Sequence, residues 1–347
     1  MRKFEVPVII LGGGITALGV VRNLGRYRVN VYHIAKQKNE AMFSRYCKRS
    51  FIVPKIEEDR EILRNFLTKF KKEISPAAVV FPCSDIFCLN LSSLKDEMDD
   101  NFHFLLPGKE IVETLVNKKK FYQSLDKYKI PYPITYFPES SNDIEKISKK
   151  LDYPTYVRPS ISQIFSQKFH KKGFVAKSQE ELTRYYMFAS KYNIDVMIQE
   201  IIPGPATNMF GINGYFDKDA SPLGFFAYQR LREWPHRFGN GSLIQSISIS
   251  DVSSIKDTAV NYLHSLGYHG LIDAEFKKDP QDGGFKFLEV NARCWWQNSF
   301  PTKCGINLVF MAYLDAIDEK IEDLENYKVG VKWMYFLNDL RSSIKMF

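Results

Sequence analysis

The sequence has few of the features that mark small disulfide-bonded, zinc-binding or membrane-spanning proteins. Its 347 residues include five cysteines and six histidines, with no C-x-x-C pair and no H-x-H or H-x-x-x-H spacing. An odd number of scattered cysteines argues against a disulfide framework and against a structural zinc site. A reducing, cytoplasmic location is therefore the default expectation.

Long apolar runs are also lacking. The most apolar stretch, residues 6–21, is interrupted by the glycines at 12–14, and it is too short to cross about 30 Å of hydrocarbon. We interpret it as a buried strand that leads into a helix. Since no other stretch is long and apolar enough, no membrane partner is expected.

The composition is that of an ordinary globular protein with 45% hydrophobic and 25% charged residues, which excludes extensive disorder. The length suits two or three packed subdomains. Lysine and arginine total 48 and aspartate and glutamate 40, a net charge of +8 that favours anionic small-molecule partners. Basic and acidic residues are interspersed rather than clustered on one element, so no nucleic-acid partner is expected.

The order of apolar segments predicts two kinds of architecture. Strands at 6–11, 29–34 and 77–82 alternate with helical patterns, including one at 59–73, which predicts an open parallel α/β sheet of Rossmann type. The remainder mixes antiparallel strands and helices, which predicts an α+β fold. Its expected strands are 154–159, 196–200, 209–217, 222–229, 271–277 and 285–292, and its expected helices are 114–128, 143–151, 180–192, 253–266 and 308–316.

The glycine turn at residues 12–14 has the spacing G-x-G-x-x-A of a dinucleotide-binding turn. An NAD site also needs an acidic residue at the end of the second strand, to hold the ribose hydroxyls. That strand ends in Ala35, Lys36 and Gln37, with no carboxylate. A tight strand-to-helix turn, or a pocket for another small molecule, fits better, and an NAD-dependent oxidoreductase is kept only as a less favoured alternative.

The most informative segment is residues 270–293, GLIDAEFKKDPQDGGFKFLEVNAR. Side chains two apart in a strand share a face, so Asp273 and Glu275 point one way. If the strands pair about the DPQDGG turn, Glu275 lies opposite Glu289 and Asp273 opposite Asn291. Carboxylates that face each other repel unless a cation neutralises them, and Mg²⁺ prefers oxygen ligands of this kind. Arg293, on the same face, suits a phosphate or carboxylate.

At this point the sequence resembles the ATP-grasp superfamily of carboxylate–amine ligases over residues 5–340. The motifs look closest to those of the carbamoyl-phosphate synthetase large subunit and of carboligases related to D-aspartate ligase. The matching segments are FLEVNAR, VNKKKFYQSLDKYKIPYP, YPTYVRPS, VMIQEIIPGP and YQRLREWPHRFGNGS. The resemblance implies a pre-ATP-grasp domain at 1–112, a small ATP-grasp subdomain with a phosphate lid at 113–198, and a large subdomain with the metal site at 199–347.

The resemblance also implies roles for individual residues. The expected metal ligands, for Mg²⁺ or Mn²⁺, are Glu275, Glu289 and Asn291, and the expected catalytic arginines are Arg230, Arg232 and Arg293. The expected ATP-binding residues are Lys118, Arg158, Ser160, Gln199, Glu200, Ile201, Ile202 and Asn208. The N-terminal domain is expected to contact the substrate through Gly13, Ser84 and Asp85, together with Trp295 from the large subdomain.

Two departures from the family pattern stand out. Arg158 is the second expected phosphate-binding base. The segment after it, residues 160–173, is expected to form the lid but contains no glycine before Gly173. The acidic residue expected seven or eight positions past Glu200 is replaced by Thr207 or Asn208. A nucleotide-binding homologue without catalysis therefore stays open as an alternative.

The activity implied by the resemblance is an ATP-dependent joining of a carboxylate to an amine, or to a thiol, through an acyl phosphate, with release of ADP and phosphate. Such a reaction needs positioned charge rather than a covalent nucleophile. The expected partners are a small-molecule carboxylate and an amine, and a homodimer is common in this group.

Overall fold

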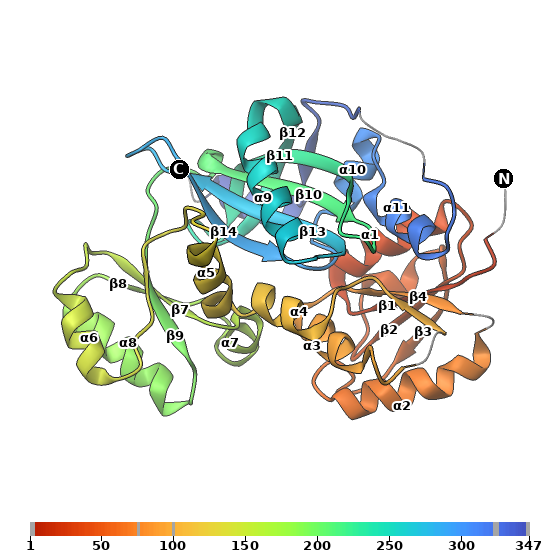
Figure 1. The fold of residues 1–347 in the computed structure, drawn as a ribbon, viewed down its shortest axis with the longest axis horizontal. Helices are drawn as coiled ribbons and strands as arrows, with labels where there is room; N and C mark the ends of the chain where they lie inside the picture. Colours follow the sequence, from red (N-terminus) through yellow and green to blue (C-terminus); the bar gives the residue numbers. More distant parts are fainter. Residues whose placement is uncertain (1–3, 75–76, 99–100, 322–325, 345–347) are drawn as a thin grey trace.

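The computed structural model describes residues 4–74, 77–98, 101–321 and 326–344, which form three β-sheets with their own helices (Figure 1). The N-terminal parallel sheet lies beside the large antiparallel sheet, and the smallest sheet extends to the other side. No helix within these described ranges is long and apolar enough to cross a membrane.

The N-terminal sheet has the strand order β3-β2-β1-β4-β5, and every pair is parallel. The run VIIL of β1 is fully buried because helices cover both faces of such a sheet. The predicted open α/β domain is thus confirmed. Its elements are β1 (Val8–Leu11), α1 (Gly14–Gly25), β2 (Val31–Ala35), β3 (Cys47–Ile52), α2 (Arg60–Phe70), β4 (Ala78–Pro82), α3 (Asp85–Leu94), β5 (Phe102–Phe104) and α4 (Lys109–Val116).

The small antiparallel sheet has the order β6-β9-β7-β8. Its elements are α5 (Lys118–Lys127), β6 (Thr135–Tyr136), α6 (Ser141–Ser148), β7 (Thr155–Pro159), α7 (Ser162–Phe169), β8 (Phe174–Ala176), α8 (Gln179–Lys191) and β9 (Val196–Glu200). The prediction of one helix over 114–128 is wrong, because Asn117 separates α4 from α5. Its backbone is extended, and its side chain accepts hydrogen bonds from the N–H groups of Lys119 and Lys120, so α5 begins anew there.

The large antiparallel sheet has the order β14-β13-β10-β11-β12-β15. Its elements are β10 (Met209–Phe216), β11 (Pro222–Trp234), β12 (Asn240–Ile247), α9 (Ser253–Ser265), β13 (Gly270–Lys278), β14 (Phe285–Asn291), α10 (Ser299–Cys304), α11 (Leu308–Ala316), β15 (Lys332–Met334) and α12 (Phe336–Ile344). The predicted register is confirmed: Glu275 pairs with Glu289, and Asp273 pairs with Asn291.

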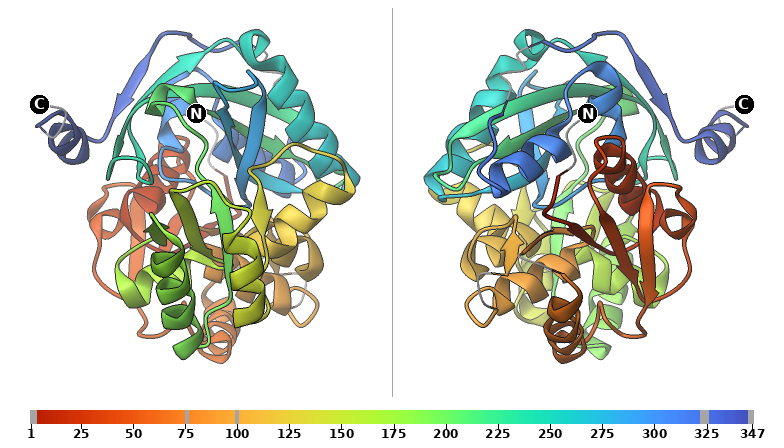
Figure 2. Two further views of the ribbon diagram at one scale, coloured as in Figure 1. Left: turned by 90° about the vertical axis from the view of Figure 1, so that its left-hand side faces the viewer. Right: turned by 90° about the vertical axis from the view of Figure 1, so that its right-hand side faces the viewer.

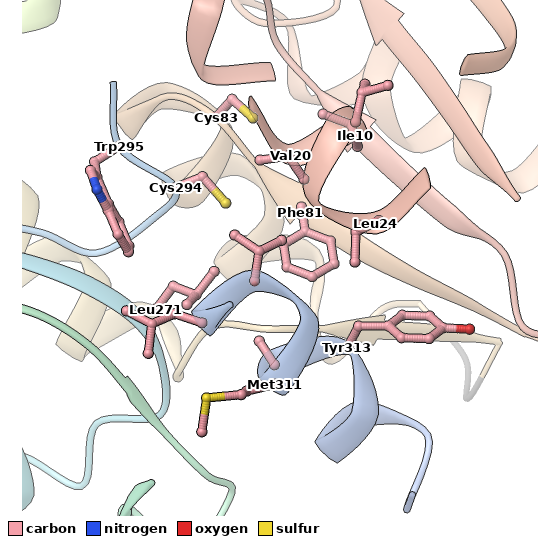
Figure 3. Close-up of a cluster of buried hydrophobic side chains, with 14 of the residues drawn as sticks. Ile10, Val20, Leu24, Phe81, Cys83, Leu271, Cys294, Trp295, Met311 and Tyr313 are labelled. Carbon is pink, nitrogen blue, oxygen red and sulfur yellow. The ribbon is translucent and has the colours of Figure 1, made fainter. Parts of the chain in front are cut away.

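A shared hydrophobic core joins the N-terminal sheet to the large sheet. It includes Val20 and Leu24 of α1, Phe81 of β4 and Met311 of α11 (Figure 3). The C-terminal helix α12, in contrast, projects from the body of the molecule (Figure 2). The three sheets therefore surround a common region, into which the ends of β7, β9, β13 and β14 bring polar side chains.

Candidate active site

The centre of this region is the carboxylate of Glu289, which two cations share. One of its oxygens, Oε2, lies 2.6 Å from Nζ of Lys118 and 2.8 Å from a guanidinium nitrogen of Arg158. Only 11% of the Lys118 side chain and 15% of the Arg158 side chain are exposed. Residues from α5, β7 and β14, which are far apart in the sequence, thus meet at one oxygen atom.

Local structure explains why these cations point inward. Lys118 is the first residue of α5 after its cap, and its backbone N–H donates to the carbonyl of Ser160, next to β7. Arg158 donates to the Tyr122 hydroxyl at 3.0 Å and to the Gln199 side chain at 3.1 Å. Tyr122 lies one turn after Lys118 on the same helix face. The two cations are therefore held by the scaffold as well as by Glu289.

The surrounding charges change the protonation equilibria of this cluster. Burial alone would raise the pKa of Glu289, but the positive charges of Lys118 and Arg158 outweigh it and hold that pKa well below its usual range. The pKa of Lys118 is lowered, because burial and the charge of Arg158 outweigh the attraction of Glu289. Glu289 is thus an anion held in place to face cations.

A second ion-pair group lies on the adjacent strands. Arg230 donates to Glu275 and to Glu233, each at 3.0 Å, and also to the carbonyl of Gly239. Only 8% of the Arg230 side chain is exposed. Because Glu275 is the register partner of Glu289, the structure places Arg230 beside the acidic pair.

Arg232 does not join this group. Its guanidinium makes two hydrogen bonds, at 2.8 and 2.6 Å, to the carboxylate of Asp339 in α12. The pairing of β11 with β12 is irregular on both sides of Arg232, so the alternation of a regular strand does not hold there. The structure therefore does not bring Arg232 together with the other predicted catalytic residues.

Asp273 organises the amide of the predicted ligand Asn291. It accepts hydrogen bonds from Asn213 at 2.8 Å, from Tyr228 at 3.1 Å and from Asn291 at 3.1 Å. Burial and the negative charge of Glu275 raise the pKa of Asp273 to about 8. The Asn291 side chain is fixed so that its oxygen accepts a hydrogen bond from Arg293.

The chemistry of Glu275, Glu289 and Asn291 fits a hard divalent cation. The three side chains share one sheet face and offer two carboxylates and one amide oxygen, the donors that Mg²⁺ takes while leaving room for phosphate oxygens. Among the described residues, no group of three or more His, Cys, Asp or Glu residues is placed to hold a metal ion by itself. Phosphate groups or water would have to complete such a site.

The predicted nucleotide-edge residues follow β9. The Glu200 carboxylate accepts a hydrogen bond from the Ile134 N–H at 2.6 Å, and the Ile202 carbonyl accepts one from Lys277 at 2.7 Å. Ile201 is half-buried next to them. Asn208, at the end of the short 3₁₀ helix Ala206–Asn208, donates to the carbonyl of Lys278. These groups lie along one strand and its continuation, with protein partners for each polar side chain.

The predicted lid is helical rather than a loop over residues 162–169, where it forms α7. The side chain of Gln163 donates to Glu57 at 2.7 Å and accepts a hydrogen bond from the Ile86 N–H, so α7 contacts the N-terminal domain. Ser160 precedes the helix and donates to Asp195. After it, Lys172 donates to Asn240 of β12, and its charge contributes to lowering the pKa of Glu289.

The predicted substrate residues of the N-terminal domain have separate surroundings. Asp85 accepts a hydrogen bond at 2.6 Å from Arg293, which connects α3 to the end of β14, where the predicted metal ligand Asn291 lies. Ser84 caps α3 by accepting from the Phe87 N–H, and Gly13 precedes α1. Trp295 is 1% exposed within the shared core (Figure 3), which contradicts its predicted contact with substrate. Its apolar ring serves packing instead.

The fold matches solved structures over nearly the whole chain. One is the biotin carboxylase domain of Hydrogenobacter thermophilus 2-oxoglutarate carboxylase, with TM-score 0.72, 14% identity and 96% and 74% of the two chains covered. Another is an ADP complex of the purK N5-carboxyaminoimidazole ribonucleotide synthetase, with TM-score 0.71, 12% identity and 96% and 82% covered. The chain thus has the ATP-grasp architecture.

Sequence relatives point to the same class, although no family model matches the chain. The chain is 24% identical over 330 residues to D-aspartate ligase of Enterococcus faecium (strain Aus0004), covering 91% of this chain and 78% of that protein. It is 24% identical over 343 residues to the carbamoyl phosphate synthase large chain of Pyrococcus furiosus, which covers 95% of this chain and 30% of that longer protein. The predicted resemblance to ATP-grasp carboxylate–amine ligases is confirmed.

Sequence reasoning missed two side chains that hold the cluster together. Tyr122 donates to the carbonyl of Leu288 at 2.8 Å and accepts from Arg158, so it connects α5, β7 and β14. Glu233 shares Arg230 with Glu275. The spacing of Lys118 and Tyr122, four residues apart on one helix, was a usable signal for the first. The position of Glu233 depends on the irregular part of β11, and the sequence holds no comparable signal for it.

Proposed function

We propose that the protein is an ATP-dependent ligase that joins a carboxylate to an amine and releases ADP and phosphate. The observation that carries the proposal is the meeting of Lys118, Arg158 and Glu289, because these are the two predicted phosphate-binding cations and a predicted metal ligand. Relatives named as D-aspartate ligase and L-amino acid ligase support amino acids as the substrate class.

The residues of the site divide the work of such a reaction. Lys118 and Arg158 would hold the phosphates of ATP, and Glu275, Glu289 and Asn291 would hold Mg²⁺, which supplies neutralisation of phosphate charge when it is bound. Arg293, fixed by Asp85, faces the same region and would stabilise negative charge on the transferred group.

A carboxylate is a poor electrophile, and phosphorylation converts it to an acyl phosphate that an amine can attack. In this proposal the γ-phosphoryl group moves from ATP to the carboxylate, and the attack of the amine forms the C–N bond and expels phosphate. Helix α7 is well placed to exclude water from the site, because Gln163 already joins it to the N-terminal domain.

The first experiment measures ADP release with Mg-ATP and pairs of amino acids, including D-aspartate, for the wild type and for Glu289→Gln. The glutamine keeps the shape of the side chain but removes the charge that two cations share. We expect ADP release to fall by roughly 10³-fold. The matched control is Glu110→Gln, at an exposed position on α4, which should leave ADP release unchanged.

ADP release by Glu289→Gln at the wild-type rate would overturn the proposal. The helical lid favours one other function, a homologue that binds nucleotide without catalysis. Thermal stabilisation of the wild type by a non-hydrolysable ATP analogue, dependent on Mg²⁺ and lost in Glu289→Gln, without ADP release for any substrate pair, would support that second function instead.

A further inference from the structure

A pocket of about 230 Å³ lies outside the candidate active site, between α1, α10 and β15. None of the residues of the Glu289 or Arg230 groups lines it. One wall comes from the N-terminal domain, and the others come from the large subdomain and its last strand. The pocket therefore exists only because these parts of the chain pack together.

The pocket has an unbalanced positive charge. Arg22 of α1 and Arg26, which follows the last residue of that helix, line one side, and Lys303 at the end of α10 lines the other. None of the lining residues, all of them described, is acidic. Arg26 also interacts with the hydroxyl of Tyr46. Within the described part of the chain, Arg22 and Lys303 form no salt bridge, unlike the cations of the active site. Such a site favours an anion.

Aromatic rings form the rest of the lining. Trp333 and Tyr335 belong to the β15 segment, and Trp296 follows the active-site residue Arg293 by three positions. The rings of Trp296 and Tyr335 meet edge to face, with centroids 5.2 Å apart. The buried indole N–H of Trp296 has no hydrogen-bond partner among the described residues. A flat ligand would find aromatic ring surface along this wall of the pocket.

The floor of the pocket is rigid. Asn298 donates to the carbonyl of Thr16 at 2.9 Å, and Asn23 donates to the carbonyl of Asn298 at 3.1 Å, so α1 and the α10 segment are bonded in both directions. A methyl group at Gly19 would lie 2.3 Å from the Asn298 side chain, which shows how closely the two segments approach. The segments that carry Arg22, Trp296 and Lys303 are therefore fixed relative to each other before any ligand binds, while the side chains of Arg22 and Lys303 are exposed.

We propose that this pocket is a binding site for a small aromatic anion, a planar ring that carries a carboxylate or phosphate group. The ring would pack against Trp296, Trp333 and Tyr335, and the anionic group would meet Arg22 and Lys303. Aromatic rings alone would not require three cations, and cations alone would not require the aromatic walls. The combination of the two selects this class of ligand.

The proposal is tested by calorimetric titration of the full chain with 2-naphthoate and with naphthalene-2-methanol, which has the same ring system but no charge. We expect 2-naphthoate to bind at one site and the alcohol to bind at least tenfold more weakly. Arg22→Ala combined with Lys303→Ala should weaken 2-naphthoate binding at least tenfold. Both residues are exposed, so the fold should tolerate the changes.

The matched control is Lys191→Ala, an exposed lysine at the end of α8, which should leave the binding of 2-naphthoate unchanged. A saturating Mg-ATP analogue should not displace 2-naphthoate, since the pocket is separate from Lys118 and Glu289. Equal binding of acid and alcohol, displacement by the analogue, or unchanged binding in the double variant would overturn the proposal. So would no binding to the wild type, including the case in which a second copy of the chain covers the pocket.

Discussion

Two arginines, two residues apart on β11, belong to ion-pair networks with different surroundings. The inner arginine, Arg230, is 8% exposed and bridges Glu233 and Glu275 beside the predicted metal ligands. The outer one, Arg232, is 34% exposed and fastens Asp339 of the projecting helix α12 (Figure 2). The ion pairs of the two networks have similar lengths but different roles. The inner network places charge where strands from different parts of the chain converge, and the outer network attaches helix α12.

The difference also concerns what happens when a partner is removed. In the inner network Arg230 is shared by Glu233 and Glu275, two carboxylates with little access to water. Loss of the arginine therefore leaves buried negative charge uncompensated. In the outer network only Asp339 is deeply buried, and Ser242 also donates to it. The comparison predicts that inner substitutions affect both activity and stability, whereas outer substitutions affect the stability of α12 alone.

Among the arginine substitutions, the largest effect on activity is expected for Arg158→Met, in the neighbouring Glu289 group. Lys118 still neutralises Glu289 in this variant, so the fold should persist, but one of the two cations proposed to hold phosphate is lost. ADP release should fall by roughly 10²–10³-fold. The control is Lys120→Met, which removes an exposed lysine two residues after Lys118 that pairs with Glu113. An Arg158→Met variant as active as the control would remove Arg158 from the proposed mechanism.

A large loss of stability is expected for Arg230→Met. The substitution leaves Glu233 and Glu275 facing each other in a buried site without their shared cation. The free energy of unfolding should fall by about 3–5 kcal/mol, measured by urea denaturation. ADP release from the remaining folded protein should fall as well. Normal stability would show that water or another cation replaces the guanidinium.

A smaller effect is expected for Arg232→Ala. Its removal leaves Asp339 with Ser242 as a remaining partner, so the cost should be about 1–2 kcal/mol. Hydrogen exchange should quicken in α12 and remain unchanged in β13 and β14, and ADP release should not change. A loss of activity comparable to that of Arg230→Met would mean that the two networks are coupled.

These two arginines also show how far the sequence could predict the structure. The apolar runs were sufficient for the central strands of the sheets, such as β1, β4, β10 and β13, and the two-residue spacing in residues 270–293 was sufficient for the register of Glu275 with Glu289. The resemblance implied a catalytic role for both Arg230 and Arg232, whereas the structure puts them in different ion-pair groups, because the pairing of β11 with β12 is irregular beside Arg232. Spacing along the chain does not reveal such an irregularity. Tertiary partners such as Asp339, 107 residues away, are equally hidden.

Two other features could not be predicted from the pattern of apolar residues. Strand β3, with the sequence CKRSFI, lies at the edge of the parallel sheet and is only partly buried, so it lacks the apolar run that identified β1 and β4. Trp295 was predicted to contact the substrate, whereas the chain buries it in the core between domains. Burial of that kind depends on contacts from both domains.

The smallest effect on activity is expected at a junction outside both networks, where a substitution should change only the pH dependence of stability. His269 precedes β13, and burial, together with the charge of Lys95, lowers its pKa from 6.5 to about 4. The unfolded chain therefore takes up a proton at His269 before the folded protein does. This contribution to stability is fully present above about pH 6.5 and is lost as the pH falls from there to about 4, by about 3 kcal/mol.

The variant His269→Asn removes this titration and should flatten the dependence of the unfolding free energy on pH between about 6.5 and 4. His264→Asn, at an exposed position near the end of α9, is the control and should keep the wild-type slope. ADP release at neutral pH should be the same for both variants, because neither histidine belongs to the inner network. Identical slopes for the two variants would show that His269 is not the source of the acid sensitivity.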